Sequence, residues 1–239
     1  RQRQMCIRDR IVDATLRDGG LVNNFRFTDE FVKDLYQTNI KAGVDVMEFG
    51  YKADKEMFDV KDFGKWKFCH EDAIRKVLGD ILDPKMQLAV MADVGRANVA
   101  RDLPDKKDSI LDVVRIATYI NTIPAAIEMI ETCAKKGYHT TVNIMAVSKA
   151  QESELEEALE MLGKSSVEVI YLVDSYGSLY PLQMRQLAQR YLEAGEKYGK
   201  KIGIHAHNNQ QLAFANTTEC AMMGVSYLDA TCLLYTSPS

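Results

Sequence analysis

Short apolar runs alternate with amphipathic stretches along most of the chain. Apolar runs rich in Val, Ile and Leu and bounded by turn residues are typical of buried parallel strands. The pattern predicts eight strands, over residues 11–17, 44–50, 87–94, 111–118, 140–147, 167–173, 201–207 and 225–230. Apolar residues at helical spacing predict six helices, over residues 29–41, 71–78, 123–136, 151–162, 181–198 and 210–223.

This alternation of strands and helices favours an α/β fold with a parallel sheet. Eight repeats in about 220 residues fit a (β/α)8 TIM barrel, and a doubly wound open sheet is the alternative. No helix follows the eighth predicted strand, so we expect a barrel truncated after strand 8. Such a barrel would leave apolar surface uncovered, and we expect poor solubility or oligomers.

The two ends of the chain do not read as protein sequence. Residues 1–9, RQRQMCIRD, and residues 232–239, CLLYTSPS, resemble the translation of a transposon-type sequencing adaptor in its two directions. We therefore expect residues 1–10 and 232–239 to be adaptor-derived. Residues 11–231 would then form one incomplete barrel domain.

Composition narrows the class of protein further. The 30 basic and 34 acidic residues give a net charge of −4, which indicates no nucleic-acid partner. We find no run of 18 apolar residues, so we expect no membrane segment. Cys69, Cys133 and Cys220 have no paired spacing, which favours a reducing, cytoplasmic compartment.

Two histidines end the seventh predicted strand. Because residues i and i+2 of a strand face the same side, the imidazoles of His205 and His207 would lie close enough to share one metal ion. Asp18, which ends the first apolar run, is the best third ligand. The alternative is one packed core histidine and one surface histidine.

Seven polar residues, three of them the candidate metal ligands, fall late in predicted strands or just after them. They are Asp18, Glu48, Asp93, Arg115, Asp174, His205 and His207. Active sites of TIM barrels lie at the carboxyl ends of the strands, so these residues predict a site there. For any one of them, a structural salt bridge is the alternative.

One connection is unusually long for a barrel of this size. Residues 51–85 carry Phe58, Phe63, Trp66 and Phe68 before the helix that begins near His70. This segment would cover the site or contact a substrate tail. The alternative is a separate aromatic cluster on the barrel or a contact between subunits.

The motifs Thr15-Leu16-Arg17-Asp18-Gly19 and His205-Ala206-His207-Asn208-Asn209 resemble those of the pyruvate-carboxyltransferase-type metallolyases. This TIM-barrel superfamily includes hydroxymethylglutaryl-CoA lyase, and within it the chain most resembles 4-hydroxy-2-oxovalerate aldolase-like proteins. The resemblance implies that Asp18, His205 and His207 bind a divalent metal, Mn²⁺ or Mg²⁺. It also implies that Arg17 is the catalytic arginine that stabilises an enolate. Residues that would support the ligands or contact the substrate are Asn209, Glu48, Arg115, Asp174, Ser175 and Tyr176.

The sequence departs from the resembling aldolases at one important position. Leu21 stands where they have a histidine that acts as base, and leucine cannot move a proton. The Glu-Gln pair of the condensing synthases is also missing at Gly20-Leu21. A base could instead come from Glu48, Tyr176, residues 51–85 or the C-terminal region that we expect to be missing.

The resemblance implies a metal-dependent aldolase that cleaves a 4-hydroxy-2-oxoacid to pyruvate, or a related 2-oxoacid, and an aldehyde. One alternative is a Claisen-type synthase that condenses an acyl-CoA with a 2-oxoacid. The other is a non-catalytic metal-binding barrel. The partner would be a small 2-oxoacid, with a homo-oligomer as a further possibility.

Overall fold

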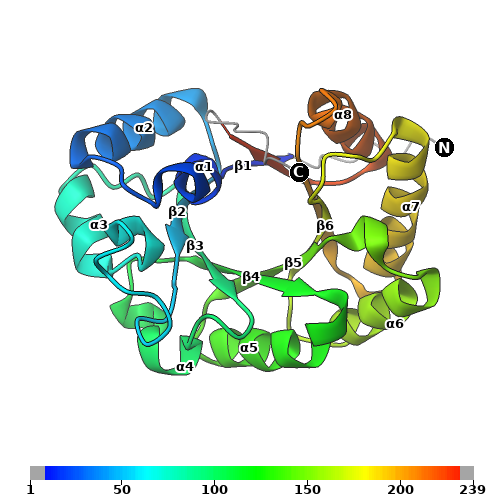
Figure 1. The fold of residues 1–239 in the computed structure, drawn as a ribbon, viewed down its shortest axis with the longest axis horizontal. Helices are drawn as coiled ribbons and strands as arrows, with labels where there is room; N and C mark the ends of the chain where they lie inside the picture. Colours follow the sequence, from blue (N-terminus) through cyan, green and yellow to red (C-terminus); the bar gives the residue numbers. More distant parts are fainter. Residues whose placement is uncertain (1–8, 232–239) are drawn as a thin grey trace.

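The computed structural model describes residues 9–231. Eight parallel strands follow one another around a closed barrel, and β8 pairs with β1 to complete it (Figure 1). The strands are β1 (Arg10–Asp13), β2 (Val46–Tyr51), β3 (Gln87–Asp93), β4 (Val113–Tyr119), β5 (His139–Met145), β6 (Val169–Asp174), β7 (Lys201–Ala206) and β8 (Tyr227–Ala230). The predicted (β/α)8 barrel is confirmed, and the open sheet is wrong.

Helices surround the barrel, and all six predicted helices are present (Figure 1). The helices are α1 (Thr15–Asn23), α2 (Asp29–Ala42), α3 (Glu71–Leu78), α4 (Val99–Asp102), α5 (Ile123–Lys135), α6 (Glu152–Gly163), α7 (Pro181–Tyr198) and α8 (Ala213–Met223). Short 3-10 turns cover Lys65–Lys67, Lys106–Asp108, Ile120–Thr122 and Val147–Lys149. The helix α2 shows why the pattern was informative, because the Thr28 hydroxyl accepts a hydrogen bond from Phe31 N at its start and Gly43 ends it at φ 75°.

The predicted adaptor segments lie almost wholly outside the described residues, at 1–8 and 232–239. Arg10, the last residue of the first predicted segment, is described by the structure as the first residue of β1 and pairs with Tyr227. The adaptor origin of the two ends stays a prediction.

The first predicted strand was too long. β1 ends at Asp13, whose buried Oδ1 accepts a hydrogen bond from the Thr15 hydroxyl at 2.5 Å. The first helical hydrogen bond of α1 then runs from Asp18 N to Ala14 O. Arg17 and Asp18 therefore lie on the first turn of α1, not on a strand.

Side chains from alternate strands fill the barrel interior in layers. Starting from the amino ends of the strands, the first layer holds Arg10, Gln87, His139 and Lys201. The second layer holds Val46, Val113, Val169 and Tyr227. The third holds Val12, Ala89, Thr141 and Gly203, which pair in register with the second. The fourth holds Glu48, Arg115, Tyr171 and Asp229. The third layer is made of small residues and the fourth is charged.

The long connection after β2 packs on the barrel. Trp66 and Phe68 are buried in the main hydrophobic core, and the Trp66 ring lies 5.9 Å from the ring of Phe49 on β2. Phe58 and Phe63 contact each other edge to face at 5.7 Å. The segment therefore packs on the barrel, but its four rings belong to or contact the main hydrophobic core and do not form a separate cluster.

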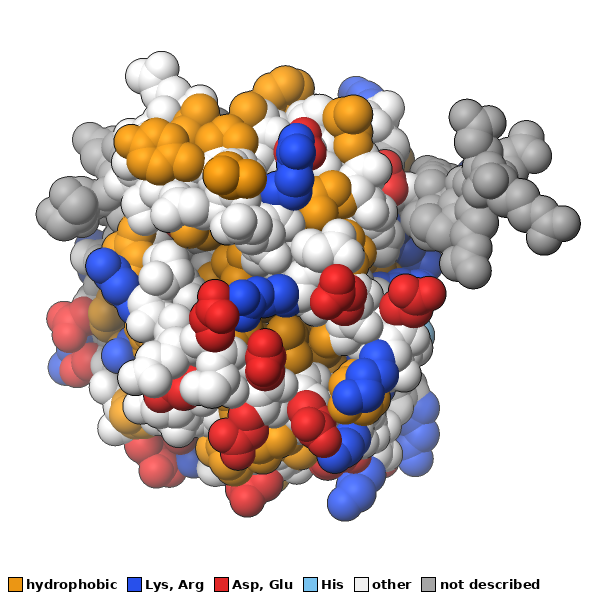
Figure 2. Space-filling view, turned by 90° about the vertical axis from the view of Figure 1, so that its right-hand side faces the viewer, with side chains coloured by type: hydrophobic (Ala, Val, Ile, Leu, Met, Phe, Trp, Pro, Cys, Tyr) orange, Lys and Arg blue, Asp and Glu red, His pale blue; other side chains and the backbone are white. Residues whose placement is uncertain are grey.

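On the side of the barrel covered by α6, α7 and α8, charged and hydrophobic side chains gather in different regions (Figure 2). Charged side chains are interspersed over its middle and lower part, and hydrophobic side chains gather at the top, over α8. Phe214 and Met222 on this helix are 86% and 81% exposed. Among the described residues, no helix has both the length and the apolar character needed to span a membrane.

Candidate metal centre

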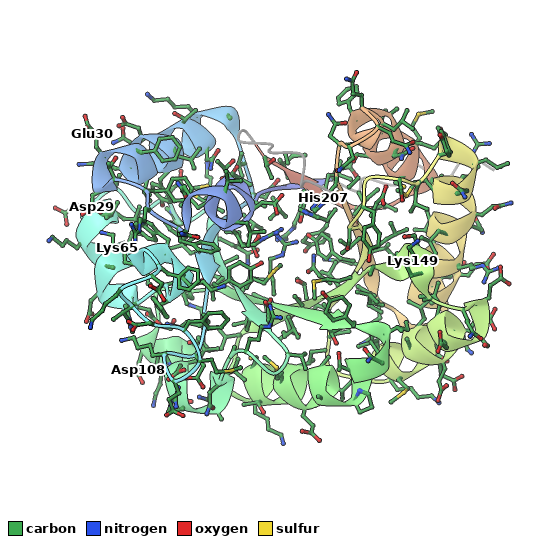
Figure 3. All side chains as sticks on the ribbon, viewed as in Figure 1. Asp29, Glu30, Lys65, Asp108, Lys149 and His207 are labelled. Carbon is green, nitrogen blue, oxygen red and sulfur yellow. The ribbon has the colours of Figure 1, made fainter. Side chains whose placement is uncertain are left out.

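Three side chains converge at the carboxyl ends of β1 and β7. His205 lies within β7, His207 follows its end, and Asp18 comes from the first turn of α1. Figure 3 shows His207 near the barrel axis, whereas Asp29, Glu30, Lys65 and Asp108 lie on the outside of the molecule. The two His Nε2 atoms are 3.1 Å apart. Asp18 Oδ2 is 3.8 Å from His205 Nε2 and 3.9 Å from His207 Nε2.

This cluster has the composition of a divalent-metal site. One ligand atom from each residue lies within 4.8 Å of the other two, so a single ion could contact all three. Two imidazole nitrogens and one carboxylate oxygen suit Mn²⁺, Fe²⁺ or Zn²⁺, and leave coordination positions for a substrate. Among residues 9–231 this is the one cluster of at least three such groups with that spacing.

Arg17 sets the electrostatics on the other side of Asp18. Its Nη1 donates to Asp18 Oδ1 at 2.7 Å, and its Nε donates to Glu48 Oε2 at 2.9 Å. Burial alone would raise the pKa of Asp18, but Arg17 and the two histidines outweigh it and hold that pKa below its ordinary value. Asp18 is therefore an ionised carboxylate at neutral pH, as a metal ligand must be.

A buried ion-pair network supports the cluster from below. Arg115 Nη1 donates to Glu48 Oε2 at 3.0 Å, and Arg115 Nη2 donates to Asp229 Oδ2 at 2.6 Å. Asp229 Oδ2 also lies 2.9 Å from His205 Nδ1. Arg115 thus connects the carboxylate that holds Arg17 to the carboxylate that holds His205.

Asp229 is the residue that the sequence analysis missed. Burial would raise its pKa, but Arg115 and His205 bring the pKa down to about 2. An ionised Asp229 makes His205 protonated at Nδ1, so that Nε2 presents its lone pair to the cluster. The sequence did contain a signal, because Asp229 is a carboxylate inside the apolar run 225–230. The search for polar residues late in predicted strands, applied to this run as well, would have included it.

The cluster forms one wall of a pocket of about 220 Å³. Arg17, Leu21 and Tyr176 also line it, as do Tyr51, Asn143 and Met145. Leu21 is 55% exposed, so its side chain faces the opening. Burial raises the pKa of Tyr51 far above its ordinary value, which makes this hydroxyl a hydrogen-bond donor rather than a base.

Some of the remaining predicted residues line the pocket, and others stabilise the backbone around it. The Asp174 carboxylate accepts from Ser178 N and Leu179 N, and so stabilises the turn after β6. Ser175 lines the pocket and its Oγ accepts from Ala146 N. Asn209 packs against Gly177, where a Cβ would lie 2.7 Å from Asn209 N. Asp93, at the end of β3, lies outside the residues that line this pocket.

Fold and site together define a (β/α)8 barrel with three candidate ligands for a divalent metal at the carboxyl ends of its strands. The chain belongs to the HMGL-like family, whose model matches residues 8–233. The family is divalent-metal dependent, which agrees with the donor atoms of this cluster.

Similar proteins with assigned activities include two kinds of enzyme. A 4-hydroxy-2-oxovalerate aldolase from Geobacillus genomosp. 3 is 26% identical over 221 residues, which are 92% of this chain and 64% of the aldolase. An oxaloacetate decarboxylase from Mycobacterium tuberculosis is 24% identical over 222 residues, 92% of this chain and 62% of that enzyme. The chain thus spans less than two thirds of each relative.

Solved structures share the fold at lower identity. The carboxyl transferase domain of Rhizobium etli pyruvate carboxylase gives a TM-score of 0.71 at 18% identity, covering 94% of this chain and 40% of the other. The HMG-CoA lyase of Brucella melitensis gives a TM-score of 0.70 at 14% identity, with 94% and 81% covered.

Proposed function

We propose that the protein is a divalent-metal-dependent carbon–carbon lyase, an aldolase that cleaves a 4-hydroxy-2-oxoacid to pyruvate, or a related 2-oxoacid, and an aldehyde. The observation that carries this proposal is the position of Arg17 beside Asp18, His205 and His207 in one pocket. Relatives named as a 4-hydroxy-2-oxovalerate aldolase and an oxaloacetate decarboxylase both act on 2-oxoacids, which supports the substrate class.

Asp18, His205 and His207 would hold the ion, with Mn²⁺ or Mg²⁺ as the first candidates. The bound ion would act as a Lewis acid toward the carboxylate and keto oxygens of the 2-oxoacid. Asp229 keeps His205 in the tautomer that such an ion requires.

Arg17 would stabilise the charge that develops when the carbon–carbon bond breaks. Glu48 and Asp18 fix its Nε and Nη1, and Nη2 is the guanidinium nitrogen that neither contact uses among the described residues. Electrons from the broken bond pass to the keto oxygen of the 2-oxoacid and form an enolate. A buried cation next to that oxygen lowers the barrier because it needs no reorganisation during the reaction.

The proton on the substrate 4-hydroxyl needs an acceptor, and the described pocket offers few. Apart from the three proposed ligands, the residues that line it include no carboxylate and no imidazole. Tyr176 and Tyr119, 47% and 51% exposed, are the two tyrosines at the opening whose hydroxyl groups could relay this proton to water.

This shortage of bases favours a second candidate, the decarboxylation of a 3-carboxy-2-oxoacid. Loss of CO₂ gives the same enolate without removing any proton from the substrate, so Leu21 is compatible with it. The relative named oxaloacetate decarboxylase supports this candidate. The acyl-CoA synthase and the non-catalytic barrel stay alternatives. The cytoplasmic location and the homo-oligomer stay predictions.

Enolate chemistry can be tested by loading the purified protein with Mn²⁺ and following the exchange of pyruvate methyl protons for deuterium by NMR. We expect exchange that a chelator abolishes and that Asp18→Asn removes. Arg17→Gln should slow it by about 100-fold, the loss typical of one oxyanion donor. Absence of exchange with one equivalent of bound Mn²⁺ would contradict the aldolase. The decarboxylase needs no base to remove a methyl proton, so it is contradicted instead by failure of the Mn²⁺-loaded protein to release CO₂ from oxaloacetate. Oxaloacetate decarboxylation and acetyl-CoA condensation, assayed in parallel, separate the candidates.

A further inference from the structure

A second cavity, of about 170 Å³, lies inside the barrel at the amino ends of the strands. We call it the amino-end cavity. Val12 and Thr141 of the third interior layer line it, whereas the ring of Tyr171 fills the space beside Gly203 of that layer. The proposed metal centre lies on the opposite side of the charged fourth layer.

Two polar atoms at the inner end of the amino-end cavity have no partner within residues 9–231. They are Arg115 Nε and Thr141 Oγ1. Arg115 is 1% exposed and Thr141 is 5% exposed, so neither is satisfied by bulk solvent. An unmet hydrogen bond in such a position is costly, and the two donors together match the two oxygens of a carboxylate.

The charge of the lining also favours an anion. Arg10 and Lys201 contribute two positive charges to the lining, against one carboxylate, that of Glu168. The charge of Arg115 is offset by its bonds to the carboxylates of Glu48 and Asp229. Glu168 is already paired, since its Oε1 lies 2.8 Å from His139 Nδ1. Arg115 Nη1 and Nη2 are held by Glu48 and Asp229, so its Nε remains to meet a ligand.

The wall between the outer rim and the inner end is apolar. Val46, Val113, Val169 and Tyr227 form one layer there, with Val12 beside them. A multiply charged ion such as phosphate would lose its hydration against this layer without gaining hydrogen bonds. A single carboxylate on a short hydrocarbon body would bury the body and pair the charged end.

We propose that the amino-end cavity binds a small aliphatic monocarboxylate. Its hydrocarbon body lies within the valine layer, and its carboxylate accepts hydrogen bonds from Arg115 Nε and Thr141 Oγ1. Lys201 and Arg10 at the rim attract the anion. The site is separate from the proposed catalytic pocket and does not depend on the proposed function.

The test uses butyrate as the probe and metal-free protein, so that no ion at the other end of the barrel can bind it. We expect 1:1 binding with a dissociation constant on the order of 1 mM, measured by NMR titration. Nuclear Overhauser contacts should join the butyrate methyl group to the methyl groups of Val113 and Val169. Butylammonium, with the same body and the opposite charge, should not bind, and phosphate should not compete.

Thr141→Val keeps the side-chain shape and removes the hydroxyl. It should weaken butyrate binding about tenfold, the loss expected for one hydrogen bond to a charged group. Thr118→Val is the matched control, because Thr118 is also buried in a barrel strand but its hydroxyl contacts Thr122. The Thr118 variant should bind butyrate normally. Substitution of Arg115 is avoided, since it would also release Glu48 and Asp229.

Three results would overturn the proposal. The first is no saturable binding of butyrate, which would mean that the amino-end cavity holds only water. The second is competition by phosphate as strong as by butyrate, which would mean a general cationic surface. The third is binding that Thr141→Val leaves unchanged, which would locate the ligand elsewhere.

Discussion

Asp229 determines how His205 is presented to an ion. The carboxylate contacts Nδ1 of the imidazole at 2.9 Å and is itself held by Arg115 at 2.6 Å. This arrangement of carboxylate, imidazole and metal recurs in metal sites because it fixes both the tautomer and the orientation of the ring. Asp229 is thus a positioning residue, since it acts through His205 rather than on a substrate.

Asp229→Asn should lower the affinity for Mn²⁺ by about 10- to 100-fold, because the neutral amide no longer favours the Nδ1-protonated ring. It should also destabilise the fold by about 3 kcal/mol, since Arg115 loses a buried partner. A competition titration with a fluorescent chelator measures the first effect, and urea unfolding of the metal-free protein measures the second.

Asp174→Asn is the control for that prediction. Asp174 is also buried and ends β6, two strands away from β8, but its carboxylate contacts only backbone amides of the following turn among the described residues. It should lower stability and leave Mn²⁺ affinity nearly unchanged. Equal losses of affinity in the two variants would mean that Asp229 acts only through folding.

The candidate metal ligands were easier to identify from the sequence than the residues that hold those ligands in position. His205 and His207 are two apart in one strand, so their common side follows from strand geometry alone. The link from Asp229 to Arg115 joins residues 114 positions apart and depends on the register of a closed barrel. No local pattern encodes it. The sequence also placed Asp174 among the site residues, because a carboxylate that caps a turn and one that binds a metal occupy the same position after a strand.

At the scale of elements, strand number and order followed from hydrophobic periodicity, and the ends of strands did not. The run from Ile11 to Arg17 reads as one strand because Thr, Leu and Arg occur in strands and in helices. The structure ends β1 at Asp13, where a carboxylate and the Thr15 hydroxyl form a buried hydrogen bond. The turn is stabilised by a side-chain hydrogen bond, and hydrophobic periodicity carries no information about such a contact.

Gly203 is required by the packing of β7 against its neighbours. A Cβ there would lie 2.5 Å from the ring of Tyr171, far inside van der Waals contact. Gly203→Ala should therefore lower the free energy of unfolding by about 1–3 kcal/mol. Thermal or urea unfolding measures this loss.

A double-mutant cycle provides the control for Gly203. Combining Gly203→Ala with Tyr171→Leu should cost less than the sum of the two single changes, because the smaller side chain makes room for the added methyl group. Strict additivity would show that the strain at Gly203 arises from the backbone and not from the tyrosine.

At the scale of the whole molecule, the surface over α8 is the one most suited to self-association. Phe214 lines a pocket of about 400 Å³ together with Ala213, Ala221 and Leu228, and this pocket extends to Asp18, His205 and Asp229 of the candidate metal centre. Contiguous apolar surface of this kind promotes contact between copies. We expect concentration-dependent association in sedimentation velocity, and Phe214→Glu should reduce it.

Leu182→Glu is the matched control, because Leu182 is 65% exposed but lies on α7 and outside that pocket. It should leave association unchanged. A monodisperse monomer for the unaltered protein at high concentration would count against the role of this surface.

The closure of β8 onto β1 has a consequence for the order of events during synthesis. Asp18 is made directly after the first strand of the barrel, whereas His205, His207 and Asp229 are made with its last two strands. A nascent polypeptide thus lacks two of its three proposed ligands, and the carboxylate that orients one of them, until the last strand is available. Uptake of the ion is then restricted to chains that have finished folding, and partly made copies do not sequester it.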